Sequence, residues 1–386
     1  MCLRRFFGVL ALVAAFSACN KPAQWPKFAS NNRNNGLAGC CDYSNYQNAK
    51  AKLCYSTNGL IESSPAIDAN GTIYFGSDDG GVYAVTRSCD RAWRYEAHAA
   101  VKSSPALSSD GTVLYVGTEN SVVALRVDNG IPVWSKPFDA VGLSSPAVSD
   151  RYIFIGSAGY MLTLDPATGN RISGWLTNTE IPGGGISSPA IGPNGMIYFA
   201  MRNFVYGYNE AGFKVWQMQL PAFDDSGTPS VGVDGTVYVG SDGGKLIAMD
   251  GNTGEFIWDL IPRGSVDISS HSIGGDPYKF GTPAVIFSRG KDTLFVTDGQ
   301  FIYRINAKTH KVENYQSCSS PLRSAPAVVR EGPIFVANAT ELVIMGSNFN
   351  QATFVKLGND LPTTSAAIAA DGTIFIGAGN NLYAVH

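Results

Sequence analysis

The sequence predicts an all-β fold, an eight-bladed β-propeller of four-stranded antiparallel blades in which an N-terminal strand completes the last blade. Three observations predict it: a short sequence motif that recurs about every 40 residues, tryptophans at nearly constant spacing, and a strand-like segment near the N-terminus that can supply the outer strand missing from the last repeat. A period of about 40 residues with strand-like contents is typical of propeller blades. Residues 51–386 therefore form one repeated domain, because each sheet must bury both faces against its neighbours.

The recurring phrase is Ser-Ser-Pro-Ala or a close variant, and it marks the inner strand of each blade. Small side chains suit strands that converge on the propeller axis, and proline is tolerated at the start of a strand. Successive copies are 40, 41, 43, 40, 54, 43 and 40 residues apart. Their prolines are Pro65, Pro105, Pro146, Pro189, Pro229, Pro283 and Pro326, and an eighth copy has Ala366 in the proline position.

The other strands of each blade follow the phrase in a fixed order. A turn such as Asn70-Gly71, which tolerates positive φ, leads into a β-rich run such as residues 72–75. A third strand such as residues 82–85 comes next, and a polar turn such as residues 165–169 leads to an outer strand with an aromatic residue. We expect the aromatic residues to pack between blades rather than to stack on carbohydrate. Five of them are tryptophans 41, 41, 41 and 42 residues apart, namely Trp93, Trp134, Trp175, Trp216 and Trp258.

The last repeat ends at His386 after its third strand and has no outer strand of its own. The segment Lys52-Leu53-Cys54-Tyr55 lies twelve residues before Pro65, as Trp93 lies twelve residues before Pro105. We predict that residues 51–55 supply the outer strand of the last blade, because this pairing removes two exposed sheet edges.

Residues 1–18 have the character of a secretory signal peptide. Arg4 and Arg5 form a basic start, and the apolar stretch 6–16 is too short to span a bilayer. The small residues before Cys19 resemble the lipobox of bacterial lipoproteins, which implies a lipid on Cys19 and an anchored N-terminal segment over residues 19–50.

Asn20 after the cysteine favours the outer membrane by the sorting rule of that family, with the protein on the periplasmic side. The alternative is ordinary secretion with cleavage near Ala15 or Ala18.

Charge excludes one class of partner. The formal net charge is −3, charged residues make up 15% of the chain, and no run is rich in Lys or Arg. Nucleic-acid binding needs a dense cationic footprint, so we expect no nucleic-acid partner. The repeats predict a monomeric propeller.

Beyond Cys19, five cysteines follow the signal peptide, enough for two disulfides and one free thiol in an oxidising compartment. Spacing does not choose among the fifteen possible connectivities. We expect the segment that carries Cys40-Cys41 to run along the outside of the ring and this pair to bond with Cys54 or Cys89. Cys318 is then the odd thiol.

The repeats resemble those of the pyrroloquinoline-quinone (PQQ)-like propeller family. The closing pattern Asp-x-x-Thr-Gly before a tryptophan is met by Asp165, Thr168, Gly169 and Trp175. Residues 25–28, Trp-Pro-Lys-Phe, also resemble a segment found before the first blade in such proteins. The resemblance implies the fold but leaves function open, since one branch holds quinoprotein dehydrogenases and another holds BamB-type lipoproteins of the outer-membrane β-barrel assembly machinery.

A quinone site would need a Ca²⁺ ion held by oxygen ligands, a general base and cationic groups at the axial mouth. We sampled this mouth by taking the residue three positions before each motif proline or its substitute. The set holds one acid and two bases, so we predict no catalytic residue, no cofactor and no metal. The eight residues are Glu62, Lys102, Leu143, Ile186, Ser226, Phe280, Arg323 and Thr363.

One connection between blades is longer than the others. Trp258 and Pro283 are 25 residues apart, where the other units show 11 to 14. A long polar loop on a regular scaffold is a common place for function, although a tolerated insertion explains it equally well. The partner-binding candidates in this loop are Arg263, Asp267, His271, Asp276, Tyr278 and Lys279.

We therefore predict a non-enzymatic, extracytoplasmic lipoprotein scaffold that binds protein partners, in a setting like outer-membrane protein assembly. Two alternatives remain at this point. One is a PQQ-dependent dehydrogenase, and the other is a surface adhesion or glycan-binding propeller.

Overall fold

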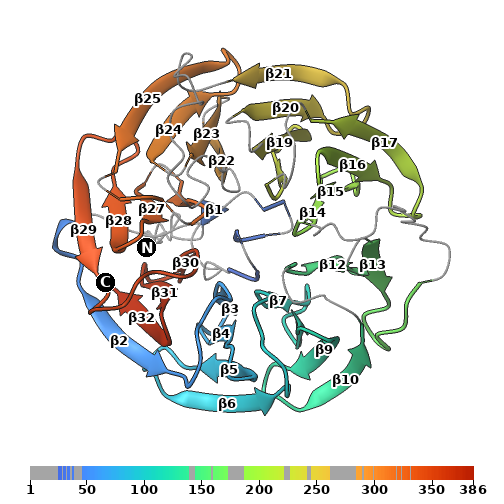
Figure 1. The fold of residues 1–386 in the computed structure, drawn as a ribbon, viewed down its shortest axis with the longest axis vertical. Coiled ribbons are helices and arrows are strands. Elements are labelled where there is room, and N and C mark those ends of the chain that lie inside the picture. The colour runs from blue at the N-terminus through green and yellow to red at the C-terminus, as the bar shows by residue number, and fades with distance from the viewer. Residues whose placement is uncertain are drawn as a thin grey trace, which may run out of the picture.

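A computed structural model describes residues 25–27, 29–31, 33–34, 37–38, 46–138, 144–157, 160–172, 187–220, 227–240, 245–260, 284–288, 291–298, 300–318, 320–322, 324–330 and 332–386. These residues form eight sheets arranged around an axis (Figure 1), which confirms the predicted eight-bladed propeller. No helix among them is long and apolar enough to cross a membrane.

Each blade runs from a short strand at the axis to a longer strand at the rim. In blades 1 to 4 the strands are β3 (Ala66–Ile67), β4 (Ile73–Gly76), β5 (Gly81–Val85) and β6 (Arg91–Glu96); β7 (Ala106–Leu107), β8 (Val113–Gly117), β9 (Ser121–Arg126) and β10 (Pro132–Pro137); β11 (Ala147–Val148), β12 (Ile153–Ser157) and β13 (Tyr160–Leu164); and β14 (Ala190–Ile191), β15 (Ile197–Met201), β16 (Phe204–Tyr208) and β17 (Lys214–Gln219). The expected outer strand of blade 3, with Trp175, lies outside the described residues.

Blades 5 to 8 repeat this order, and two of them also contain a strand from the N-terminal part of the chain, β2 in blade 8 and β1 (Leu37–Ala38) in blade 7. Their strands are β18 (Ser230–Val231), β19 (Thr236–Gly240), β20 (Leu246–Asp250) and β21 (Phe256–Leu260); β22 (Ala284–Ser288), β23 (Lys291–Thr297), β24 (Phe301–Asn306) and β25 (Lys311–Ser317); β26 (Ala327–Val329), β27 (Ile334–Ala337), β28 (Glu341–Met345) and β29 (Ala352–Lys356); and β30 (Ala367–Ile368), β31 (Ile374–Ala378), β32 (Asn381–Val385) and β2 (Ala51–Ser56). A 3₁₀ turn, η1 (Tyr46–Asn48), precedes β2.

Blade 8 closes the ring as the sequence predicts. Strand β2 pairs antiparallel with β32, with Ala51 opposite Val385 and Ser56 opposite Asn381. The first and last parts of the domain thus share one sheet, which removes the free edge of each.

The motif serines have a role beyond their small size. The first hydroxyl of the motif accepts a hydrogen bond from the second strand of its own blade, as Ser144 Oγ does from the Gly156 N–H at 2.9 Å. The second hydroxyl accepts from the backbone of the preceding blade, as Ser104 Oγ does from the Ser64 N–H at 2.9 Å. The second kind of bond links blades around the axis, through Ser365, Ser64, Ser104, Ser145 and Ser188.

The hydrophobic core is a series of layers between adjacent blades, and the tryptophans lie in it as predicted. Trp93 of blade 1 packs with Leu125 of blade 2, and its Nε1 donates to the Val127 carbonyl at 2.8 Å. Its ring also covers Gly130, where a Cβ atom would lie 2.6 Å from Trp93 Cε3. Trp134 and Trp216 make the corresponding Nε1 hydrogen bond to the turn of the next blade.

The seam between blades 8 and 1 replaces this tryptophan contact with a disulfide. Cys54 is the one buried residue of β2, as Trp93 is of β6. It bonds to Cys89, which has a φ of 72° in the turn where blades 2 to 5 have glycine and blades 6 and 7 have His310 and Phe349, also with positive φ. The expected pairing of Cys40 or Cys41 with Cys54 or Cys89 is therefore wrong, since these two bond to each other. Cys40 and Cys41 lie outside the described residues, and Cys318 is free and buried.

The expectation that the N-terminal segment runs along the outside is also wrong where the structure describes it. The described residues of this segment, 25–27, 29–31, 33–34 and 37–38, lie at the axis of the ring, drawn in blue at the centre of Figure 1. Trp25 bridges Ile67 of blade 1, the Arg33 carbonyl accepts from Val231 of blade 5, and β1 (Leu37–Ala38) pairs in parallel with β26 of blade 7. The inner strands leave backbone groups unpaired at the axis, and this segment supplies partners for them.

Candidate functional site at the axial mouth

The axial mouth is the end of the ring where each outer strand connects to the inner strand of the next blade. The predicted mouth residues Glu62 and Lys102 lie there on neighbouring blades, and Lys102 Nζ is 2.7 Å from Glu62 Oε2. The same amine is 3.7 Å from Oδ2 of Asp78, which lies in the turn between β4 and β5. One cation thus bridges two carboxylates across the junction of blades 1 and 2.

The electrostatics of this trio follow from its partial burial. The hydrogen bond to Glu62, together with the charge of Asp78, raises the pKa of the Lys102 amine. Burial raises the pKa of the Asp78 carboxyl, and the charge of Glu62 adds to this effect against the opposing charge of Lys102. Asp78 Oδ1 is buried and has no hydrogen-bond partner among the described residues.

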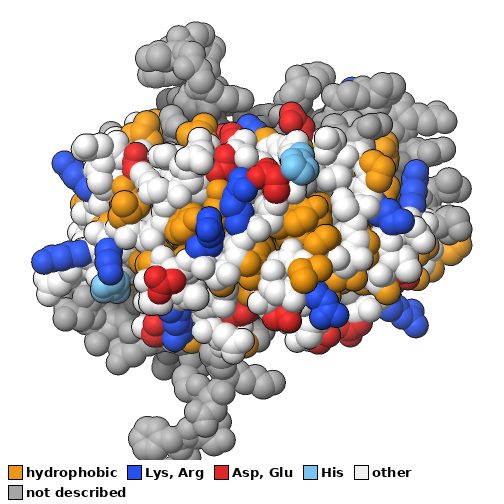
Figure 2. All heavy atoms as spheres, turned by 90° about the horizontal axis from the view of Figure 1, so that it is seen from below, with side chains coloured by type: hydrophobic (Ala, Val, Ile, Leu, Met, Phe, Trp, Pro, Cys, Tyr) orange, Lys and Arg blue, Asp and Glu red, His pale blue; other side chains and the backbone are white. Residues whose placement is uncertain are grey.

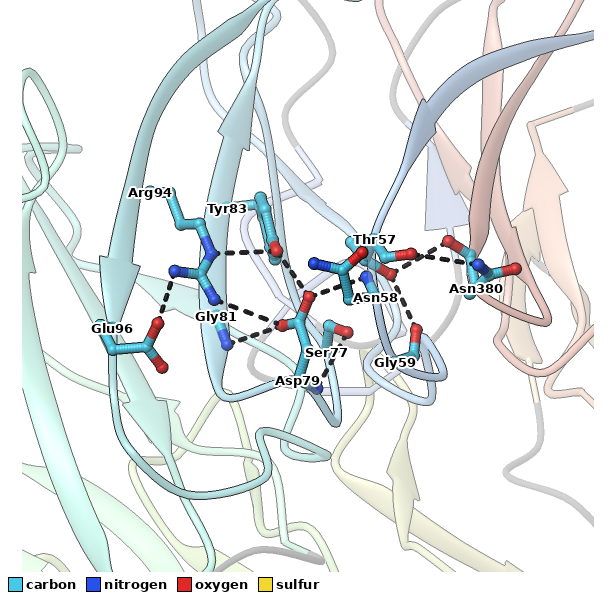
Figure 3. Close-up of polar contacts among 10 residues, drawn as sticks. All are labelled: Thr57, Asn58, Gly59, Ser77, Asp79, Gly81, Tyr83, Arg94, Glu96 and Asn380. Carbon is cyan, nitrogen blue, oxygen red and sulfur yellow. Dashed lines mark hydrogen bonds and ion pairs between the residues drawn. The ribbon is translucent and has the colours of Figure 1, made fainter.

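A second cluster lies beside it at the seam, around Asp79 (Figure 3). The Asp79 carboxylate accepts from the Tyr83 hydroxyl at 2.7 Å and from the backbone N–H groups of Asn58 and Gly81, each at 2.9 Å. Arg94 adds a third side chain, since its Nε donates to the Tyr83 hydroxyl oxygen at 3.0 Å and its Nη2 lies 3.8 Å from Asp79 Oδ1. Asp79 therefore ties the connection from blade 8 to the first blade.

These contacts shift the ionisation of Tyr83 and Asp79 in opposite directions. Burial, followed by the hydrogen bond to Asp79, raises the pKa of Tyr83 to about 12. Burial alone would raise the pKa of Asp79, but the hydrogen bonds from Tyr83 and two backbone N–H groups, with the charge of Arg94, lower it overall. Asp79 stays ionised and holds the loop, which is a structural role.

The connection at the seam is also held to blade 8. Thr57 Oγ1 donates to the Asn380 carbonyl at 3.0 Å, and Asn380 Nδ2 donates to the Thr57 carbonyl at 3.0 Å (Figure 3). Thr363, another predicted mouth residue, donates its hydroxyl to the carbonyl of Ile61 at 2.5 Å. The described part of the mouth is thus a network between blades 8, 1 and 2.

Sequence reasoning missed the pairing of an aspartate with a tyrosine on the following strand. The pattern recurs in blade 6, where the Tyr303 hydroxyl donates to Asp298 at 2.5 Å. An Asp four or five residues before a Tyr, across the turn into the third strand of a blade, is the signal that could have identified it.

The remaining predicted residues cannot be placed. Outside the described residues lie the lipidation candidate Cys19 and the mouth residues Leu143, Ile186, Ser226, Phe280 and Arg323, together with the loop candidates Arg263, Asp267, His271, Asp276, Tyr278 and Lys279.

The described residues do not fit a metal-bound quinone. Glu62 is paired with Lys102, and Asp79 is occupied by its own loop. No three His, Cys, Asp or Glu side chains in the described part of the chain could hold a metal ion together. The axis itself is filled by Trp25 and Lys27, each 2% exposed.

The rim offers a different surface. Figure 2 shows one side of it, where hydrophobic side chains lie among Lys, Arg, Asp and Glu with no field of a single sign. Several outer strands expose a large hydrophobic residue, but the four outer-strand tryptophans that the structure describes are only 6% to 8% exposed and cannot stack on a glycan. The exposed residues are Leu53, Val133, Val215, Phe256, Ile257, Tyr315 and Phe354.

Comparison with known proteins gives a family and a fold. The family model described as "Outer membrane protein assembly factor BamB" matches residues 38–180 and 202–285. No curated protein sequence matches the chain.

Three solved structures share the architecture at low sequence identity. BamB from Moraxella catarrhalis is 16% identical with a TM-score of 0.58, and the match covers 79% of this chain and 94% of that one. Quinohemoprotein alcohol dehydrogenase from Comamonas testosteroni is 14% identical with a TM-score of 0.73, covering 94% and 80%. A europium-containing methanol dehydrogenase is 13% identical with a TM-score of 0.72, covering 92% and 90%. At these identities the structures establish the fold alone.

Proposed function

The chain belongs to the family of outer membrane protein assembly factor BamB, and on that premise we propose that it is a non-enzymatic, lipid-anchored scaffold that binds components of an outer-membrane β-barrel assembly machinery. The match of the family model over more than half of the chain carries this proposal. Cys19 bears the lipid, and the outer membrane holds the protein on its periplasmic side. The Cys54–Cys89 disulfide and the family both indicate an extracytoplasmic protein.

The geometry of the mouth supports binding rather than chemistry. Charged side chains that the structure describes there form ion pairs with each other, as in Glu62 with Lys102 and Asp79 with Arg94. A catalytic acid or base needs a perturbed group within reach of a substrate, whereas these groups hold loops in place. A rigid ring with fixed loops loses little entropy on docking a protein partner.

Purification of the full-length protein from solubilised membranes of its source organism tests the proposal. We expect components of the β-barrel assembly machinery to co-purify with the wild-type protein and to be identified by mass spectrometry. A variant at the rim, Val133→Lys, should also retain these components, because the proposed binding surface is the mouth and not the rim. Recovery of none of these components would contradict the proposal.

The dehydrogenase alternative is tested on the same preparation. Addition of PQQ and Ca²⁺ should produce neither a quinone absorption band nor dye reduction with alcohols or sugars. Appearance of both would assign the chain to the enzymatic branch.

A further inference from the structure

The axial segment enters the ring from one defined end. Trp25 and Ile67 form an antiparallel bridge, in which the Trp25 N–H donates to the Ile67 carbonyl at 3.2 Å and the Ile67 N–H donates back at 2.7 Å. Strand β3, which ends at Ile67, runs from the axial mouth toward the turn at residues 68–72. At Trp25 the chain therefore runs toward the mouth from the opposite end of the ring, which we call the turn face.

The rest of the segment is inserted as a loop that returns to the same face. Asn34 Nδ2 donates to the carbonyls of Pro189 at 3.1 Å and Pro229 at 3.2 Å, which lie nearer the mouth than the Ile67 level. The Lys27 amine donates to Asn34 Oδ1 at 2.8 Å inside the loop. Strand β1 then runs parallel to β26, which leads the chain back to the turn face.

The anchor proposed at Cys19 is only six residues before Trp25. Six residues span at most about 20 Å when fully extended. A blade of four strands extends about 14 Å from its inner to its outer strand, and a strand of five residues is about 17 Å long. A linker that left the turn face and passed around the rim to the mouth would therefore need about 30 Å, while Lys27 and Asn34, buried at the axis, occupy the direct route.

We propose that the membrane surface lies against the turn face of the propeller, so that the axial mouth and its loops point away from the lipid. This inference rests on the lipid anchor of the proposed function. It adds an orientation that the anchor alone does not give, because a long flexible linker would leave all faces equally accessible to the bilayer.

Fluorescence quenching on vesicles tests the orientation. Ser109, in the turn after β7, is exposed on the turn face, and Glu119, in the turn after β8, is exposed at the mouth of the same blade. The lipoprotein, with Cys40, Cys41 and Cys318 changed to serine, carries a thiol-linked fluorophore introduced by Ser109→Cys or Glu119→Cys. It is incorporated into phosphatidylethanolamine–phosphatidylglycerol vesicles with a quencher on the lipid headgroup.

We expect the Ser109 label to be quenched several-fold more than the Glu119 label. Insertion of twenty Gly and Ser residues between Ala23 and Gln24 should remove most of the difference. Equal quenching of the two labels without the insertion, or stronger quenching of the Glu119 label, would overturn the orientation.

Two further measurements separate the premise from the inference. Mass spectrometry of the mature N-terminus reports whether Cys19 carries lipid, so an unmodified cysteine would refute the anchor itself, and with it the orientation. Neutron reflectometry of the unsubstituted lipoprotein on a supported bilayer needs no labelled variant. It should show a protein layer as thin as the disc lying flat, and a layer as thick as the diameter of the disc would contradict the proposal.

Discussion

Cys54 and Cys89 form a disulfide across the junction of two adjacent blades, the last and the first of the ring, with their Cα atoms 4.9 Å apart. Cys54 belongs to the outer strand of blade 8, and Cys89 lies in the last turn of blade 1. At several other junctions these two places hold a tryptophan and a residue of positive φ, which is glycine in Trp93 with Gly130 and histidine in Trp258 with His310. The chain itself continues across this junction, from β2 through residues 57–65 into β3. The disulfide adds a covalent bond between the two blades where other junctions have a packing contact.

Loss of the disulfide should destabilise the protein measurably. The bond closes a loop with a sequence separation of 35 residues, for which the chain-entropy argument gives about 3–4 kcal/mol. We expect Cys54→Ser/Cys89→Ser to lower the free energy of unfolding by about this amount in denaturant titrations. The control Cys318→Ser should leave the response to reductant unchanged, and equal midpoints for the oxidised and reduced wild-type protein would contradict the prediction.

The conformation of Cys89 allows a partial rescue. Its φ of 72° lies in the left-handed region, where a residue with a Cβ atom costs roughly 1–2 kcal/mol. Cys54→Ser/Cys89→Gly should therefore be more stable than Cys54→Ser/Cys89→Ser by about 1 kcal/mol in the same titration. If the glycine variant is the less stable of the two, the turn does not favour glycine at this position.

Gly130 and Gly111 separate steric contact from backbone strain. Both have positive φ, 72° and 71°, but only at Gly130 would a Cβ atom meet the Trp93 ring, whereas at Gly111 no described atom lies within 4 Å. We expect Gly111→Ala to cost about 1 kcal/mol and Gly130→Ala to cost roughly 2–4 kcal/mol, because the indole must move. Denaturant titration measures both costs, and tryptophan emission should shift to longer wavelength only for Gly130→Ala. Equal costs would show that the ring does not depend on this contact.

Lys27 should make stability depend on pH. Burial lowers the pKa of its amine to about 7, and no described carboxylate pairs with it. Between about pH 7 and its model-peptide value near 10.4 the unfolded chain binds the proton more tightly, so this group's contribution to stability rises with pH over that interval. Lys27→Met should remove this rise. Its stability relative to wild type should be highest below pH 7 and should fall toward pH 10.

The hydrogen bond from Lys27 to Asn34 gives the Lys27→Met variant a second effect, which must be separated from the titration of the amine. Methionine leaves Asn34 Oδ1 without the Lys27 donor, at a cost of about 1–3 kcal/mol that does not vary with pH. A constant offset between wild type and Lys27→Met from pH 6 to pH 10 in urea titrations would mean that the amine does not titrate in the folded protein.

Lys102 should matter through the two carboxylates it bridges. Lys102→Met leaves Glu62 and Asp78 facing each other without a cation, and we expect a loss of about 0.5–1 kcal/mol near pH 7, since the side chains are partly exposed. A carboxyl whose pKa is raised on folding favours the folded state at low pH and loses that advantage as the pH rises through its folded value. Stability of the variant should therefore recover as the pH falls toward 5. The double variant Lys102→Met/Asp78→Asn should show no such recovery, and a loss independent of pH would assign the effect of Lys102 to packing.

Periodicity explains what the sequence could predict. The recurrence of the proline motif and the nearly constant spacing of the tryptophans identified the eight blades, and the missing outer strand of the last repeat identified residues 51–55 as its replacement. Both follow from regularities that repeat eight times along the chain, so errors in any one copy do not matter.

The non-repeating parts were not predictable in this way. The segment before the first blade occurs only once, so no repeated pattern predicts that Trp25 bridges Ile67 at the axis. That contact depends on backbone groups of the inner strands that the other strands of the ring leave unpaired. The Cys54–Cys89 bond could have been predicted, since Cys89 occupies the same turn position as Gly130 in the next repeat and Cys54 lies on the strand that closes the ring. Asp79 with Tyr83 was missed because an aspartate in a turn is ordinarily a capping residue.

Crosslinking in cells tests whether the protein is a binding scaffold that presents its axial mouth to protein partners. A photoreactive amino acid is placed at Glu119 at the mouth or at Ser109 on the turn face, and the crosslinked products from intact cells of the source organism are identified by mass spectrometry. We expect position 119 to crosslink to a component of the β-barrel assembly machinery and position 109 not to. Crosslinks to that machinery from position 109 alone, or from neither position, would contradict it.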